Sequence, residues 1–224
     1  MSRPPARDLD LVLFGATGFT GALTAEYLAA AAPASTRWAL AGRNPRKLAA
    51  LRDRLGADVG ILEADAEDPR GLRRVAERSR VVVSTVGPYV RYGQPLMGAC
   101  AETGTDYVDL SGEPEFVDVA YLRHHATAER TGARLVHACG FDSVPHDLGA
   151  LFTVGQLPPD QPIRLRGYVR AGGVLSGGTF DSAVTSFSSQ CGEAASRPWI
   201  GSPFGSARTG DVFASTRTDT PSTS

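Results

Sequence analysis

Lysine is almost absent from this sequence, and its scarcity excludes several nucleotide-binding motifs. Only Lys47 among the 23 basic residues is a lysine. Arg46 precedes it and Leu48 follows it, so the sequence has no phosphate-binding loop of the G-x-x-x-x-G-K-[ST] type. None of the six tyrosines has a lysine four residues later, which excludes the Tyr-x-x-x-Lys pair of short-chain dehydrogenases. No G-x-S-x-G motif occurs, so the nucleophile of an α/β-hydrolase is missing as well.

The sequence also has few cysteines, little net charge and no long apolar run. Its three cysteines form no C-x-x-C pair, which predicts a reduced protein without a structural zinc. The formal net charge of -1 and the pI of about 6.4 argue against binding to nucleic acid. No stretch reaches the roughly 20 apolar residues of a membrane span, and the run LVLF is too short for a signal peptide. We therefore expect a cytoplasmic protein with no metal site, no nucleic-acid partner and no integral membrane segment.

Short apolar runs alternate with helical stretches along residues 9–138, which is typical of βαβ units with a parallel sheet. The expected strands are Leu9–Phe14, Trp38–Ala41, Gly60–Glu63, Val81–Val86, Tyr107–Leu110 and Leu135–Ala138. The expected helices are Phe19–Ala31, Pro45–Leu55, Pro69–Arg78, Gln94–Glu102 and Glu115–Arg130. Asn44-Pro45 and Asp68-Pro69 are expected to cap two of them. The sequence thus predicts the α/β class with a doubly wound parallel sheet, the Rossmann fold.

Composition divides the remaining chain into further segments. A helix at Asp142–Phe152 completes the first domain, which we place at residues 1–152 as the nucleotide-binding domain. The link GQLPPDQP leads to residues 153–200, where a strand at Ile163–Val169 and a helix at Asp181–Ser189 predict the beginning of a second α/β domain, for the substrate. Residues 201–224 are polar and are expected not to fold. The second domain is thus expected to be incomplete, and its open sheet edge predicts a homodimer.

The segment LDLVLFGATGFTGALTAEYL carries the strongest functional signal. A strand leads into Gly15-x-x-Gly18-x-x-Gly21, and a helix follows directly. Glycines in this arrangement permit a tight turn, a close approach of the backbone to a pyrophosphate and close packing of the helix on the strand. The amides and the dipole of the helix N-terminus favour phosphates. We therefore expect a dinucleotide site formed by Gly15, Ala16, Thr17, Gly18, Phe19, Thr20 and Gly21.

The residues after the second strand indicate which dinucleotide binds. NAD sites place an acid there for the ribose 2′-hydroxyl, whereas NADP sites place a cation there for the 2′-phosphate. Here Arg43 ends the strand, and Arg46 and Lys47 follow without an acid nearby. The sequence therefore favours NADP(H), with Arg43 and Lys47 as binding residues; the alternative is that Arg46 and Lys47 only face solvent. Asp65, after the third strand, is expected at the adenine, or else as a solvated loop acid.

Residues after the later strands are expected at the nicotinamide end of the site. Tyr89 is a candidate hydrogen-bond donor to ribose or substrate, and packing in the core is its alternative. Glu113 is a candidate acid near the substrate, or else a first-turn acid favoured by its helix dipole. Asp142 is a third catalytic candidate, or else a helix cap. The edge of the cofactor is expected to follow Ser84, Thr85, Val86, Gly87 and Pro88.

Five motifs in this order resemble the saccharopine dehydrogenase-like oxidoreductases: GATGFTG, AGR, VGPYVRYGQPLMGAC, GTDYVDLSGE and CGFDSVPHDLG. That family includes the trans-acting enoyl reductases of bacterial lipid synthesis. The match covers residues 9–152, and SGGTFDSA is similar to the glycine-threonine segment at the start of the family's substrate domain. The resemblance implies an NADP(H)-binding fold joined to an α/β substrate domain whose chain normally continues well past this C-terminus.

The motifs and the resemblance together predict an NADP(H)-dependent oxidoreductase. The expected reaction is hydride transfer to the polarised double bond of an enoyl thioester, either a small molecule or an acyl chain on a carrier. An imine is the other acceptor that the resemblance implies. The proton is expected from Tyr89, Glu113 or water. A non-catalytic NADP-binding module, or a truncated and inactive member of the family, is the alternative, because the second domain is expected to be incomplete.

Overall fold

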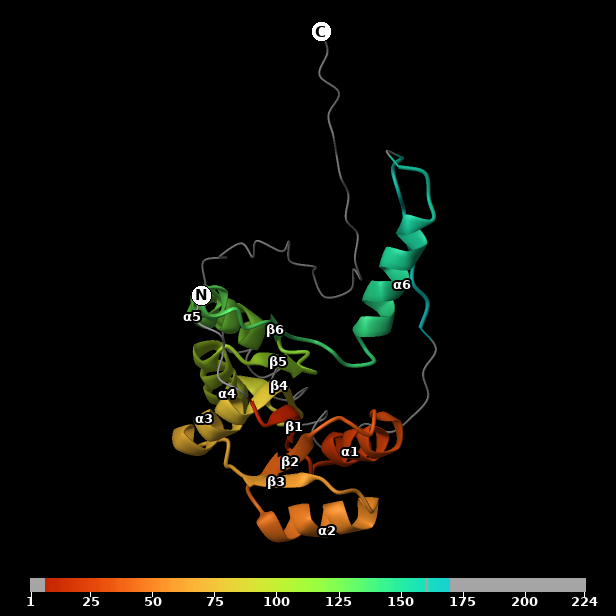
Figure 1. Cartoon of the computed structure of the whole chain (residues 1–224). Coiled ribbons are helices and arrows are strands. Elements are labelled where there is room, and N and C mark those ends of the chain that lie inside the picture. Colours follow the sequence, from red (N-terminus) through yellow and green to blue (C-terminus); the bar gives the residue numbers. More distant parts are fainter. Residues whose placement is uncertain (1–6, 160, 170–224) are drawn as a thin grey trace.

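Six parallel strands form the sheet at the centre of the computed structural model, which describes residues 7–159 and 161–169 (Figure 1). The strands are β1 (Leu9–Phe14), β2 (Trp38–Gly42), β3 (Gly60–Glu63), β4 (Ser79–Ser84), β5 (Asp106–Asp109) and β6 (Leu135–Val136). Their order in the sheet is β3-β2-β1-β4-β5-β6, and each neighbouring pair is parallel. After β3 the chain crosses to the other half of the sheet through the segment that leads to β4, which lies beside β1. This order confirms the predicted doubly wound Rossmann fold.

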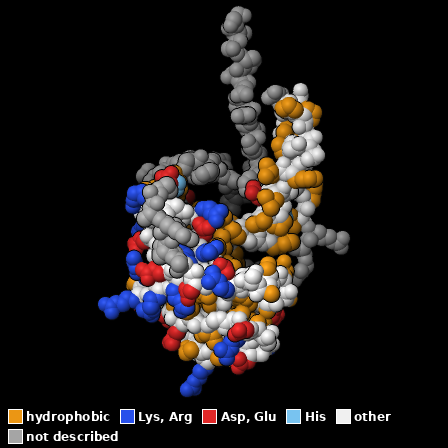
Figure 2. Space-filling view, viewed as in Figure 1, with side chains coloured by type: hydrophobic (Ala, Val, Ile, Leu, Met, Phe, Trp, Pro, Cys, Tyr) orange, Lys and Arg blue, Asp and Glu red, His pale blue; other side chains and the backbone are white. Residues whose placement is uncertain are grey.

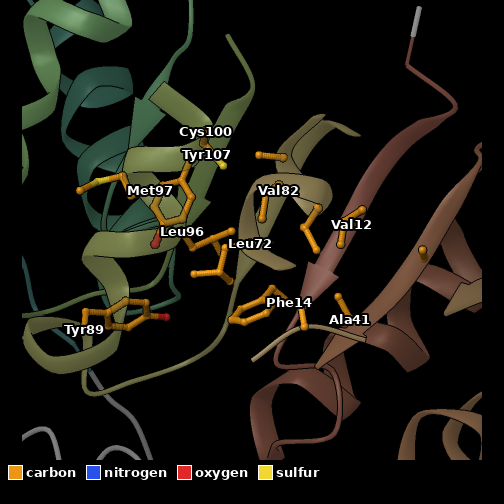
Figure 3. Packing of buried hydrophobic residues seen from close by; sticks show 14 of the residues in the cluster. Val12, Phe14, Ala41, Leu72, Val82, Tyr89, Leu96, Met97, Cys100 and Tyr107 are labelled. Atoms are coloured by element: carbon orange, nitrogen blue, oxygen red, sulfur yellow. The ribbon is translucent and has the colours of Figure 1, made fainter. Parts of the chain in front are cut away.

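Helices cover both faces of the sheet. One face is covered by α1 (Phe19–Ala31) and α2 (Pro45–Leu55), and the other by α3 (Pro69–Arg78), α4 (Tyr89–Thr103) and α5 (Pro114–Thr131). Because successive side chains of a strand point to opposite faces, β1 contributes Leu13 to the first layer and Val12 and Phe14 to the second. Leu96 and Met97 of α4 pack in this second layer (Figure 3). Apolar packing on both faces thus fixes the position of each strand end.

The two helix caps predicted from Asn44-Pro45 and Asp68-Pro69 are confirmed. The side chain of Asn44 accepts the amide of Lys47 at 3.0 Å at the start of α2. The side chain of Asp68 accepts the amide of Arg70 at 3.0 Å at the start of α3. In each case the proline that follows the cap has no amide hydrogen to lose.

Helix α4 begins at Tyr89, five residues before the predicted start at Gln94, and contains Pro95 in its interior. Proline is favoured in the first turn of a helix, which is why the sequence predicts the later start. The carboxylate of Glu113 accepts the amides of Tyr89 and Val90 and so stabilises the additional turn. The start of this helix therefore depends on a residue from the next loop.

Three strands end earlier than the sequence predicts, and β5 is one of them because it ends at Asp109 rather than Leu110. Strand β4 ends at Ser84 rather than Val86, because Thr85 turns toward the β1–α1 connection and bonds the carbonyl oxygen of Phe14. Strand β6 ends at Val136 rather than Ala138. Ala138 has a φ of 55°, a left-handed conformation that no strand continues.

Helix α6 (Val144–Gly155) extends away from the sheet (Figure 1). It begins two residues after the predicted start, and none of its residues is buried within the described part of the chain. Leu151 and Phe152 are 68% and 71% exposed, and Figure 2 shows apolar side chains along this helix. Among the described residues, no helix is long and apolar enough to cross a membrane.

The strand predicted at Ile163–Val169 is wrong, because residues 162–169 have no regular secondary structure. An alternating pattern produces a strand only where a neighbouring strand pairs with it. Here Ile163 is 38% exposed, and no partner strand lies beside it in the described ranges. The predicted helix at Asp181–Ser189, the SGGTFDSA segment and the tail at 201–224 lie outside the described residues.

Arg7 joins segments at the amino-terminal edge of the sheet. Its side chain is 8% exposed in the folded chain and donates to four uncharged acceptors: the carbonyl oxygens of Ala76, Ser79 and Thr103 and the hydroxyl of Thr105. Burial lowers the pKa of the guanidinium from its usual value. These bonds connect the start of β4 with the start of β5 and hold the two strands in register.

Candidate functional site

Two of the three glycines at the turn from β1 into the first turn of α1 are required by their conformation and close packing. Gly15 has a φ of 84°, and a Cβ at this position would lie 2.6 Å from Cγ2 of Val86. A Cβ on Gly21 would overlap the carbonyl oxygen of Gly15. Gly18 differs, because its φ of -75° suits any residue and its Cβ would meet, within the described chain, only the Gly15 oxygen at 3.3 Å. The fold thus needs glycine at positions 15 and 21 and leaves the surface at Gly18 open.

This open surface fits a pyrophosphate. Gly18 is the N-cap of α1, whose first turn has no acidic residue and no side-chain cap. The amides and the dipole at such a helix N-terminus attract phosphate. Thr17 is exposed and Phe19 is 70% exposed, whereas Ala16 is buried in the layer between α1 and the sheet. Ala16 therefore offers only its backbone to a ligand.

A cavity of about 280 Å³ lies where β2 and β3 end. Arg43, which follows β2, and Asp65, which follows β3, both line it, so the structure brings together two residues predicted for the adenosine end. Arg74 of α3 adds a second guanidinium, 3.9 Å from the carboxylate of Asp68. The sequence does not predict Arg74 at this cavity, because the position of Arg74 depends on how helix α3 packs against the sheet rather than on the end of a strand. The lining also includes the carboxyl groups of Glu63, Asp65 and Asp68, so three acidic side chains accompany the two guanidinium groups.

Lys47 does not line this cavity. Its side chain is exposed, and its backbone amide takes part in the cap of α2. Asp65 also has a local bond, since one carboxylate oxygen accepts the amide of Glu67 at 3.0 Å. Of the two residues predicted to bind the 2′-phosphate, Arg43 lines this cavity and Lys47 does not.

Residues 84–88, which the sequence predicts at the edge of the cofactor, start at the end of β4, and Thr85 and Val86 lie beside the glycine turn. The hydroxyl of Thr85 donates to the carbonyl oxygens of Phe14 at 3.0 Å and Gly15 at 3.2 Å. The backbone amide of Thr85 also donates to the Phe14 oxygen, at 3.0 Å. Ser84 is buried at the end of β4, and the Gly87-Pro88 peptide that follows is cis. These contacts hold the β4 end against the β1–α1 turn.

Glu113 caps α4 from the loop that precedes α5. The residue is 3% exposed, and its two carboxylate oxygens accept the amides of Tyr89 at 3.1 Å and Val90 at 2.7 Å. Helix α4 has no side-chain cap of its own, so these bonds satisfy amides that would otherwise be unpaired. The structure therefore gives Glu113 a contact that neither predicted interpretation included.

The hydroxyl of Tyr89 points into the molecule. The residue is 4% exposed, and its hydroxyl donates to the carbonyl oxygen of Ser84 at 3.0 Å. Figure 3 shows the ring directed toward Phe14. Burial, together with the nearby carboxylates of Asp109 and Glu113, raises the pKa of the Tyr89 phenol well above its usual value. Tyr89 therefore keeps its proton at neutral pH and uses it to hold the end of β4.

Asp109 and His137 form a pair that the sequence analysis did not identify. The Asp109 side chain is fully buried at the end of β5, and its Oδ2 lies 2.8 Å from Nδ1 of His137, which follows β6. Its Oδ1 accepts the amides of Ser111 at 3.0 Å and Ala138 at 3.3 Å. A polar residue at or directly after the end of each of two neighbouring strands is the signal that indicates such a pair, since parallel strands end at the same edge.

Asp142 lies apart from these groups. It is exposed, and α6 has Ser143 as its N-cap without a side-chain cap bond, so Asp142 does not cap this helix. Within residues 7–159 and 161–169, no hydrogen bond connects Asp142 to Tyr89 or Glu113. The same residues contain no group of three histidine, cysteine or acidic side chains that could hold a metal ion.

Comparison with known proteins agrees with this geometry. The family described as the saccharopine dehydrogenase NADP binding domain matches residues 11–136. A protein of Mycobacterium tuberculosis is 56% identical over 145 residues, which cover 63% of this chain and 34% of that protein. The trans-acting enoyl reductase of Mycobacterium leprae is 52% identical over 148 residues, which cover 65% of this chain and 35% of that protein. The chain thus spans about a third of the length of these curated relatives.

A solved structure supports the fold. The apo saccharopine dehydrogenase (L-Glu forming) of Saccharomyces cerevisiae has a TM-score of 0.54 and 21% sequence identity to this chain. The match covers 66% of this chain and 31% of the yeast enzyme. At this identity the likeness concerns the arrangement of strands and helices.

Gly18→Val is expected to abolish NADP(H) binding while the domain stays folded. The backbone at position 18 suits a branched residue, but its side chain would occupy the surface where the pyrophosphate approaches. Calorimetric titration with NADPH and circular dichroism on one sample measure both properties. Gly21→Val is the control, and it should unfold the domain because its side chain would overlap the backbone of Gly15. Retained binding by Gly18→Val would show that the turn has only a structural role.

Glu113→Gln is expected to lower the free energy of unfolding by about 1–3 kcal/mol, because one of the two α4 amides then loses its buried acceptor. Urea unfolding followed by circular dichroism measures the loss. Glu115→Gln, in the first turn of α5, should lose less than about 1 kcal/mol. A stable Glu113→Gln protein that has lost catalysis would instead identify Glu113 as the substrate acid.

Proposed function

This chain belongs to the family of saccharopine dehydrogenase NADP-binding domains, and we propose that it is the nucleotide-binding part of a reductase that acts on enoyl thioesters. Its cofactor is NADP(H). The open backbone surface at Gly18, at the uncapped start of α1, is the observation that carries the proposal. The relatives of Mycobacterium leprae and Mycobacterium ulcerans, which are 52% and 50% identical, are named trans-acting enoyl reductases, and this supports an enoyl acceptor.

The chain's own residues divide the work of holding the cofactor. The backbone of residues 15–21 receives the pyrophosphate, and Arg43 pairs with the 2′-phosphate in the cavity at the ends of β2 and β3. Asp65 and Arg74 line the same cavity around the adenosine. Residues 84–88 then guide the other half of the dinucleotide along the end of β4. This path crosses the sheet where the strand order reverses, which is the binding place that the fold favours.

The chemistry follows from the cofactor. When bound, NADPH supplies a hydride to the β-carbon of the enoyl thioester and is released as NADP⁺. The protein aligns the acceptor and excludes water. Loss of that alignment raises the activation barrier by several kcal/mol, which lowers the rate by about 10²-fold or more. A proton must then reach the α-carbon to complete the saturated product.

We further propose the form of the acyl substrate, the oligomeric state and the cellular location. The acyl group is presented as a small thioester or on a carrier, since both carry the same reactive double bond. A homodimer remains the predicted assembly. Cys100 and Cys139 are free thiols, which supports a cytoplasmic location.

Arg43→Ala is expected to remove the preference for NADPH over NADH. The charge-assisted contact with the 2′-phosphate is worth about 1.5–3 kcal/mol, or roughly 10- to 150-fold in affinity. Calorimetric titration of both nucleotides against wild type and variant measures it. Lys47→Ala is the matched control, because Lys47 is exposed and does not line the cavity. An Arg43→Ala protein with an unchanged preference would contradict the assignment.

The reductase activity itself is tested by following NADPH oxidation in the presence of enoyl thioesters, with imines as the competing substrate class. We expect saturation of the enoyl double bond, with one NADPH consumed for each acyl product detected by mass spectrometry. Turnover restricted to imines would replace the enoyl assignment. NADPH binding without turnover of either class would favour a non-catalytic nucleotide-binding module.

A further inference from the structure

Polar residues lie at or directly after the ends of three neighbouring strands, at the edge of the sheet that carries the glycine turn. Ser84 at the end of β4 is paired in register with Asp109 at the end of β5. His137 directly follows Val136, the last residue of β6, which pairs with Val108. Since neighbouring strands lie about 4.8 Å apart, His137 is roughly 14 Å from the β1 end across the sheet. It therefore lies on the side of the site that the adenosine cavity does not occupy.

Asp109 holds His137 firmly and in one orientation. Its carboxylate is fully buried, and within the described residues the only ionisable side chain that it hydrogen-bonds is the His137 ring, at 2.8 Å. The ring stands edge-on to Phe116, with centroids 5.3 Å apart, and edge-on to Tyr107 at 6.2 Å. These contacts fix the ring plane, while Nε2 has no hydrogen-bond partner in the described part of the chain.

We propose that His137, through Nε2, donates the proton that completes the reduction, and that Asp109 is its positioning residue. This inference rests on the proposed reductase function. After hydride addition to the β-carbon, the electron pair of the former double bond is on the α-carbon and the thioester oxygen. The Nε2–H bond of the imidazolium breaks, its proton forms the new C–H bond at the α-carbon, and its electron pair stays on Nε2. Water then protonates Nε2 again, while Nδ1 keeps its hydrogen toward Asp109 throughout.

The other two candidate donors are already engaged. The Tyr89 hydroxyl donates to the Ser84 carbonyl oxygen and its raised pKa opposes release of the proton. Both carboxylate oxygens of Glu113 accept backbone amides of α4. His137 combines a buried carboxylate on one ring nitrogen with a second ring nitrogen that has no hydrogen-bond partner in the described residues, and histidine is the side chain that most often serves in general acid–base catalysis.

Asp109→Asn tests the pair without changing its size. The amides of Ser111 and Ala138 both donate to Oδ1 of Asp109, so the oxygen of an asparagine side chain must take that position to accept them. Its NH₂ group then faces Nδ1 of His137 and donates to it. The wild-type ring, when neutral, carries its hydrogen on Nδ1, and the substitution moves this hydrogen to Nε2.

Nitrogen-15 NMR of histidine-labelled protein reads this tautomer independently of activity, and His137→Gln identifies the signal. We expect the Nδ1–H form in the wild type and the Nε2–H form in Asp109→Asn. With NADPH and an enoyl thioester, both variants should lose about 10²- to 10⁴-fold in turnover while their affinity for NADPH is unchanged. His125→Gln is the control and should keep full turnover, because His125 is a surface residue that pairs with Glu129.

The possible failures are distinguishable. Full turnover by His137→Gln would overturn the role of His137 and leave the proposed reductase function intact. A wild-type ring with its hydrogen on Nε2 would overturn the pairing with Asp109. A wild-type protein that binds NADPH but reduces no enoyl thioester would overturn the proposed function, and the proton-donor role with it.

Discussion

The first turn of helix α1 lies almost in contact with the end of strand β1, and the rest of the site depends on this close approach. Gly21 permits it, and the positive φ of Gly15 keeps the connection short. The first amides of α1 are thereby placed at the edge where the strand order reverses between β2 and β4. A crevice for a dinucleotide is therefore a product of close packing, and the selection of NADP(H) is the role that we propose for Arg43.

Buried charged groups hold the two edges of the sheet. At the amino-terminal edge, Arg7 bonds backbone and hydroxyl acceptors of the segments around β4 and β5. At the opposite edge, Glu113 accepts amides from the first turn of α4, and Asp109 accepts amides from the segments that follow β5 and β6. Each charge has the partners that burial requires. The Tyr107 hydroxyl is the exception, since it is buried without a partner in the described residues. The strand ends next to the proposed reaction are therefore rigid before any ligand arrives.

The sequence predicts those features whose determining residues lie close together in the chain. It does not predict features that depend on residues far apart in the chain. Helices α1, α2 and α3 match their predicted bounds, because their glycines, caps and prolines lie within a few residues of each start. The start of α4 depends on Glu113, 24 residues beyond Tyr89, and the Asp109 and His137 pair joins residues 28 apart. Of the site, the glycine turn and Arg43 follow from sequence spacing. The proton donor does not, because its partner lies on another strand.

Lys47 has a practical consequence for chemical labelling. It is the only side-chain amine in the sequence, it is exposed, and it lies in the first turn of α2, four residues after Arg43. Lysine is among the commonest residues in proteins, so amine acylation normally yields mixed conjugates. Here an amine-reactive fluorophore would modify one side chain, close to the cavity at the ends of β2 and β3. The residue that the sequence almost lacks thus provides the one side-chain attachment point, apart from the chain's α-amine, from which occupancy of the proposed adenosine end is observable.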